Sequence, residues 1–194
     1  MAGFIDDLMK NYGGEVSKQL SSALGIDQSV AEGLIPQVAP MIMGGLKKQM
    51  ETRGGADRAN HILDKYGKES ALDNIGDLFA AGAKEENPDP GLGGLLGDSG
   101  HKAADVLGSQ FNLSGDIVKK VIPMLAPVVL GALTRKRDKE GAGSGGIASL
   151  IDQDGDGQIL DDIGGFLMGA LGSSGSKKSG GGIGDLLGGL LGKG

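Results

Sequence analysis

The chain has 194 residues, a net charge of −6 and no cysteine. The acidic balance argues against a general nucleic-acid-binding protein, which normally carries a basic surface. Disulfide and thiolate chemistry are excluded. Hydrophobic residues make up 39% of the chain and aromatic residues only 3%, so a core must be built from Leu, Ile, Val, Met and Ala.

The N-terminal segment, MAGFIDDLMKNYGG, does not resemble a secretory signal, because it has two early aspartates and no basic n-region. The longest strongly apolar run, residues 121–133, is too short to span a bilayer as a helix. We therefore expect a cytoplasmic protein. Export that does not need a signal sequence is left open.

Apolar residues recur at helical spacing along most of the chain, which predicts an all-α fold. Helices are predicted near residues 2–12, 14–24, 56–66 and 71–82, and over the apolar stretch that begins at Ala31. Asp27 stands before that stretch and suits an N-cap. Because the residue before a proline resists the α conformation, Pro36 predicts a break between a short helix and a longer one.

The chain contains an internal repeat. Residues 25–46, GIDQSVAEGLIPQVAPMIMGGL, align at an offset of 87 with residues 112–133, NLSGDIVKKVIPMLAPVVLGAL. Residues 63–79 align with residues 151–167 at an offset of 88. The two copies share the pattern I-P-x-x-A-P-x-x-x-G-x-L. The sequence therefore predicts a tandem duplication, with the N-cap repeated at Ser114 and the helix break repeated at Pro123.

The repeat divides the chain into four expected segments. These are a first helical unit (residues 1–82), a linker (83–98), a second helical unit with a D-x-D-x-D-G loop (99–171), and a Gly/Ser linker with a Gly/Leu-rich C-terminal segment (172–194).

The proline-containing helix pattern, followed by the segment DQDGDGQILDD, resembles the YidB-like family of bacterial proteins, a family of unknown function. The resemblance covers most of the chain. It implies a small all-α, homeodomain-like helical unit, present here in tandem duplicated form with Gly-rich linkers and tail. It implies no activity and no catalytic residues, and we expect a protein that is not an enzyme.

The loop at residues 152–162 is a candidate calcium site. An EF-hand loop places oxygen ligands at positions 1, 3, 5, 7 and 12, with glycine at position 6. The corresponding residues are Asp152, Asp154, Asp156 and Gln158, the last through its backbone carbonyl. Position 12 is Ile163, so Asp162 would have to close a shorter loop. Calcium binding would then be weak, on the order of 10⁻⁴ to 10⁻³ M.

The same acids also suit an Asp/Gly turn that favours the N-terminus of a following helix, without metal. In the first unit, Tyr66 and Lys68 occupy the positions of Asp154 and Asp156, so the repeat does not require the acids. Densely packed carboxylates repel each other without a cation, which favours a ligand. Both interpretations remain open.

The predicted function is structural or protein-interaction work, with self-association or a protein partner. One alternative is a DNA-binding helical module that uses two basic clusters, Lys47, Lys48 and Arg53 in the first unit and Arg135, Lys136, Arg137 and Lys139 in the second. Another is association with a membrane surface through residues 180–194, where glycine recurs at every fourth position.

Overall fold

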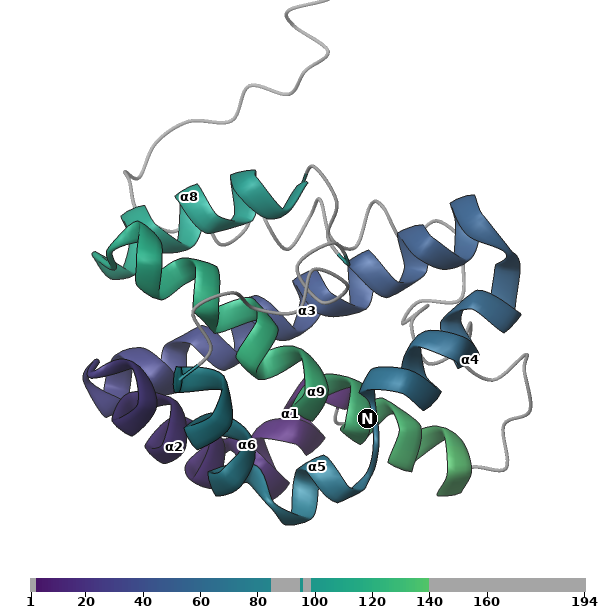
Figure 1. The fold of residues 1–194 in the computed structure, drawn as a ribbon, viewed down its shortest axis with the longest axis horizontal. Coiled ribbons are helices and arrows are strands. Elements are labelled where there is room, and N and C mark those ends of the chain that lie inside the picture. Colours follow the sequence, from purple (N-terminus) through teal and green to yellow (C-terminus); the bar gives the residue numbers. More distant parts are fainter. Residues whose placement is uncertain (1–2, 85–94, 96–98, 140–194) are drawn as a thin grey trace, which may run out of the picture. The chain divides into compact units, whose positions relative to one another are not determined.

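The computed structural model describes residues 3–84, 95 and 99–139, and these residues form an all-helical body without strands (Figure 1). The prediction of an all-α protein is confirmed for this part of the chain. Its elements are α1 (Phe4–Leu8), η1 (Met9–Gly13), α2 (Gly14–Leu24), α3 (Gln28–Arg53), α4 (Gly55–Tyr66), α5 (Ser70–Asp73), α6 (Ile75–Lys84), α8 (Ser99–Phe111) and α9 (Gly115–Lys139).

The N-terminal helices are continuous with each other. We expected helices near 2–12 and 14–24, but Gly13 and Gly14 both have right-handed helical backbone angles, so the chain does not break between them. The segment η1 is π-helical and lies within this continuous helical run. The run ends at Gly25, which adopts φ +65°.

The prediction of a helix break at the prolines is wrong. α3 runs without interruption through Pro36 and Pro40, and α9 runs through Pro123 and Pro127. An internal proline removes one helical hydrogen bond and costs a helix about 3 kcal/mol. Apolar side chains on both sides of the prolines are buried, and this tertiary packing outweighs the local penalty.

The predicted helix at 71–82 is divided into α5 and α6 at Asn74. Its backbone leaves the helical region, with φ −129° and ψ 45°, and its side chain donates from Nδ2 to the carbonyl oxygen of Ser70 at 3.2 Å. Asparagine competes with helical hydrogen bonds through such local contacts, which explains the break. α6 then extends to Lys84, two residues into the predicted linker; of that linker, only residues 83, 84 and 95 are described.

One hydrophobic core joins the two predicted repeat units. α9 packs against α3, α4, α5 and α6, and buried residues from both units form a single cluster. α9 is long and apolar enough to cross a membrane by length and composition, but 72% of its most apolar window is buried inside the protein. The role that the structure shows for α9 is therefore that of a core helix.

Aligned positions of the two units have the same local backbone. Gly25 ends α2 with φ +65°, and Asn112, 87 residues later, follows α8 with φ +52°. The next helices begin alike: the amide of Ala31 donates to the carbonyl of Asp27, and that of Val118 donates to the carbonyl of Ser114. Both residues stand at the predicted positions, but only one side chain makes a capping hydrogen bond. Asp27 is the N-cap residue of α3 without such a bond, whereas the Ser114 Oγ accepts from the amide of Ile117 at 3.4 Å.

Candidate functional site

The C-terminal end of α9 presents basic side chains to the first unit. Arg135 donates from Nη1 to the Tyr12 hydroxyl at 2.8 Å, and its Nε lies 3.4 Å from Oε2 of Glu69. The hydrogen bond to Tyr12 is the main factor that raises the pKa of Arg135 above its ordinary value. The guanidinium is therefore a permanent positive charge between η1 and the turn that precedes α5.

Arg137 joins α9 to α4. Its Nη1 donates to Oδ1 of Asn60 at 3.2 Å and lies 3.5 Å from Oδ1 of Asp64. Its Nε donates to the neighbouring Asp138 at 2.7 Å, which is the first cause of a raised pKa for the guanidinium. Two of the four cations in the second basic cluster thus hold the units together.

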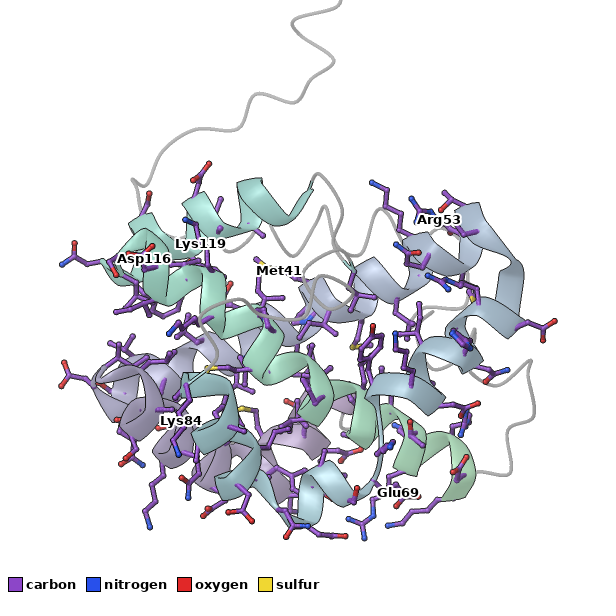
Figure 2. All side chains as sticks on the ribbon, in the orientation of Figure 1. Met41, Arg53, Glu69, Lys84, Asp116 and Lys119 are labelled. Atoms are coloured by element: carbon purple, nitrogen blue, oxygen red, sulfur yellow. The ribbon has the colours of Figure 1, made fainter. Side chains whose placement is uncertain are left out.

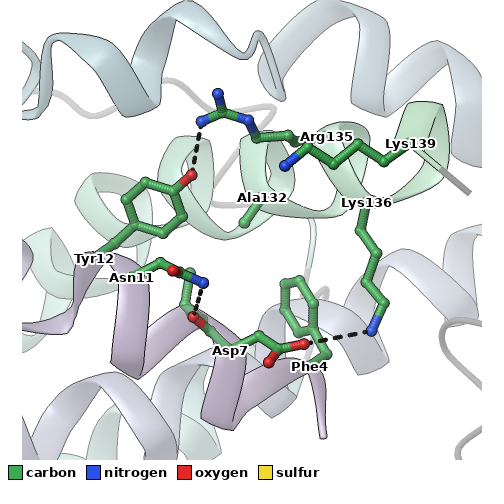
Figure 3. A pocket seen from close by; sticks show the side chains of 9 residues that line it. Phe4, Asp7, Asn11, Tyr12, Ala132, Arg135, Lys136 and Lys139 are labelled. Carbon is green, nitrogen blue, oxygen red and sulfur yellow. Dashed lines mark hydrogen bonds and ion pairs between the residues drawn. The ribbon is translucent and has the colours of Figure 1, made fainter. Parts of the chain in front are cut away.

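A cleft of about 370 Å³ lies between the N-terminal helical run and the last turns of α9 (Figure 3). Its floor is apolar, with the buried side chains of Phe4 and Leu8. Its polar rim includes Lys136, whose Nζ lies 3.8 Å from Oδ2 of Asp7. The lining residues are Phe4, Asp7, Leu8, Asn11, Tyr12, Ala132, Arg135, Lys136 and Lys139.

The π-helical turn η1 shapes one wall of this cleft. It contributes Asn11, whose Nδ2 donates to the backbone oxygen of Asp7 at 2.7 Å, and Tyr12, which is held by Arg135. π-Helical turns are rare in proteins, and those that occur are often found at functional sites. We find no feature of the sequence that marks this turn, because a π-helix has no distinctive spacing of residues. Sequence reasoning therefore missed the cleft, although it singled out three of its cations.

The cleft is lined by three cations and one carboxylate above an apolar floor, and two of the cations, Arg135 and Lys136, also contact carboxylates of the first unit. Lysine and arginine side chains bind carboxylates and phosphates, and arginine can do so through two parallel hydrogen bonds. The site is therefore suited to a ligand that carries negative charge together with an apolar group.

The first basic cluster is arranged differently. Lys47 is buried, and its Nζ contacts Oε1 of Glu51 at 3.1 Å within the same helix. Lys48 and Arg53 are exposed near the end of α3. Lys47 thus has its acidic partner within α3. At least three members of the second cluster have acidic partners in the first unit, so those charges contribute to joining the units.

The predicted calcium ligands lie outside the described residues, as does the C-terminal segment 180–194. Those ligands are Asp152, Asp154, Asp156, Gln158 and Asp162. Within the described ranges, the structure brings together no group of three or more His, Asp or Glu side chains that could hold a metal ion.

Comparison with known proteins identifies a family but no characterised relative. The model of a family described as bacterial protein of unknown function, DUF937, matches residues 6–136. No curated protein and no solved structure matches the chain significantly.

Proposed function

The chain belongs to this family of bacterial proteins of unknown function, DUF937, and we propose that it is a non-catalytic, tandemly duplicated interaction protein that binds a partner in the cleft between η1 and α9. The observation that carries the proposal is the cationic rim over an apolar floor. Such a surface fits an acidic protein segment that also inserts an apolar side chain. A buried apolar anchor surrounded by polar contacts is the usual composition of a binding hot spot.

The distribution of charge along the chain is compatible with a second copy as the partner, because every copy carries both the cleft and acidic segments. The described residues hold 16 of the 19 Lys and Arg but only 14 of the 25 Asp and Glu. Their net charge is therefore +2, whereas the remaining residues, with 3 basic and 11 acidic side chains, carry −8. A cationic cleft on one copy and acidic segments on another are electrostatically complementary.

Sedimentation equilibrium of the full chain tests this proposal. At low salt we expect a mass above the 19.5 kDa of one chain. At high salt the mass should fall towards that value, because the Debye length shortens to ~3 Å at 1 M. A mass of 19.5 kDa at every salt and protein concentration would exclude self-association through this cleft.

We also propose that the 152–162 loop binds Ca²⁺. The support is a comparison with the aligned loop of the first unit, whose carboxylates are paired with arginines of α9. There, Asp64 is paired with Arg137 and Glu69 with Arg135. On α3, which aligns with α9, Met50 takes the place of Arg137 and Lys48 that of Arg135. The second loop thus has more carboxylates and fewer aligned cations than the first. A bound divalent cation would supply the missing positive charge.

Calorimetric titration of calcium into the metal-stripped full chain tests this second proposal. The parent should release or absorb heat, with affinity on the order of 10⁻⁴ to 10⁻³ M. A variant with both Asp154→Ala and Asp156→Ala should show no such heat. The absence of heat in the parent up to millimolar calcium would reduce the loop to an acidic turn.

A further inference from the structure

The two long helices have nearly the same pattern of burial. The ten buried residues of α3 are Ala31, Leu34, Ile35, Val38, Ala39, Ile42, Met43, Gly45, Leu46 and Lys47. At an offset of 87, every one of them aligns with a residue that is buried on α9. The agreement extends to one polar position, since Lys47 and the aligned Thr134 are both buried. The two helices therefore occupy equivalent environments over most of their surface.

Three buried residues of α9 depart from this agreement. The buried residues are Met124, Val128 and Gly131. At the aligned positions, α3 has residues that are only partly buried, in the same order Gln37, Met41 and Gly44. Positions separated by four and then three residues lie on one face of a helix. The difference is thus a single stripe, here called the 37–41–44 stripe; Figure 2 labels its central residue, Met41.

The covered stripe on α9 shows what its partner is. A Cβ atom placed on Gly131 would lie 3.0 Å from the backbone oxygen of Lys68, in the turn after α4. A Cβ atom placed on Gly82 of α6 would lie 3.1 Å from Cγ of Met124. The segment from Gly67 to Lys84 of the first unit therefore packs on α9 of the second unit.

We propose that the 37–41–44 stripe of α3 is the docking surface for residues 155–172 of the same chain. These residues align with 67–84 at an offset of 88, and they include Gly155 at the position of Gly67. The stripe in turn has Gly44 at the position of Gly131. The two units would then exchange their C-terminal helices, each covering the long helix of the other.

Contacts between the described helices show the same exchange, in which each unit covers the long helix of the other. α2 of the first unit contacts α9, and α8, which aligns with α2, contacts α3. Leu8 and Leu95, 87 residues apart, are both buried at 3% exposure in the common core. The connection is long enough, because the 15 residues between Lys139 and Gly155 can span up to ~50 Å when extended.

Paired spin labels test the docking, since the chain has no natural cysteine. The control is Glu69→Cys with Arg135→Cys, two side chains in contact at 3.4 Å. The test is the aligned pair, Gly157→Cys with Lys48→Cys, in calcium-free buffer and diluted with unlabelled protein. We expect the test pair to give the same short, narrow distance as the control. A long or broad distance overturns the proposal, and so does a short one that disappears on dilution, which would place the segment on another copy.

Hydrogen exchange on stripe variants gives an independent readout in the full chain. Met41→Glu should remove protection from amides between residues 158 and 171 and leave those of α4 and α6 protected. The comparison variant at the aligned position is Val128→Ala, because a charge at this fully buried residue would destabilise the whole core. It should lower the protection of α5 and α6 and leave that of residues 158–171 unchanged. Unchanged protection at 158–171 in Met41→Glu, or no protection there in the parent, would contradict the docking.

Discussion

Gly67 and Leu130 bring two backbones into direct contact where the turn after α4 meets α9. A Cβ atom on Gly67 would lie 2.7 Å from the carbonyl oxygen of Leu130, closer than real Cβ contacts allow. Gly67 has φ −101°, which any residue can adopt, so the need for glycine here is steric. The turn after α4 is pressed against α9 at this point, and the first unit is thereby fixed to the second.

Gly67→Ala should therefore destabilise the protein. The added methyl group meets backbone atoms that cannot rotate away, and overpacking of this kind costs about 1–3 kcal/mol. Denaturant unfolding followed by circular dichroism should show a lower midpoint with an unchanged slope. An unchanged midpoint would mean that the contact between α4 and α9 is looser than the structure indicates.

Gly14→Ala should have the opposite effect. Gly14 is helical, exposed and, apart from its own helix, has no described atom within 4 Å of its Cβ position. Glycine inside a helix costs about 0.5–1 kcal/mol relative to alanine. The variant should gain about that amount in the same unfolding experiment. A loss of stability would show that the junction of η1 and α2 needs the freedom of glycine.

Pro36→Ala should also stabilise the protein. The substitution restores an amide donor for the carbonyl of Glu32 inside a continuous helix, and the ring of Pro36 is only partly buried. The expected gain is up to ~3 kcal/mol, the usual penalty of an internal proline. Pro123→Ala, at the aligned position of α9, serves as the matched comparison. Thermal unfolding in which both variants melt below the parent would indicate that the rings contribute packing that exceeds this penalty.

Met50→Arg should weaken calcium binding if both the loop site and its docking on α3 are as proposed. The new guanidinium would stand at the position of Arg137 and compete with Ca²⁺ for Asp152. A loss of about fivefold in affinity corresponds to ~1 kcal/mol, the upper range for an exposed ion pair. Ser22→Arg, an equal change of charge at an exposed position of α2, should leave the titration unchanged. Equal calcium affinities of Met50→Arg and the parent would show that the loop does not lie against α3.

The helical class could be predicted from apolar spacing, because the burial of apolar side chains at helical spacing stabilises the helices of this chain. The repeat indicated which positions would be alike, and Asp27 and Ser114 begin their helices as expected. The prolines were misleading, since local propensity was outweighed by packing that becomes visible only in the tertiary structure. The cleft could not be predicted, because it depends on Tyr12 and Arg135, which meet only through the fold.

The measurement that most directly tests the central claim is sedimentation equilibrium of two charge-reversed chains beside the parent at low salt. The first chain carries Lys136→Glu and Lys139→Glu at the rim of the cleft. The second carries Lys18→Glu and Lys119→Glu, an equal change of charge on exposed residues that do not line it. The account predicts that the first chain sediments as a 19.5 kDa monomer while the second retains the larger mass of the parent. Equal masses for all three chains would contradict binding through the cleft.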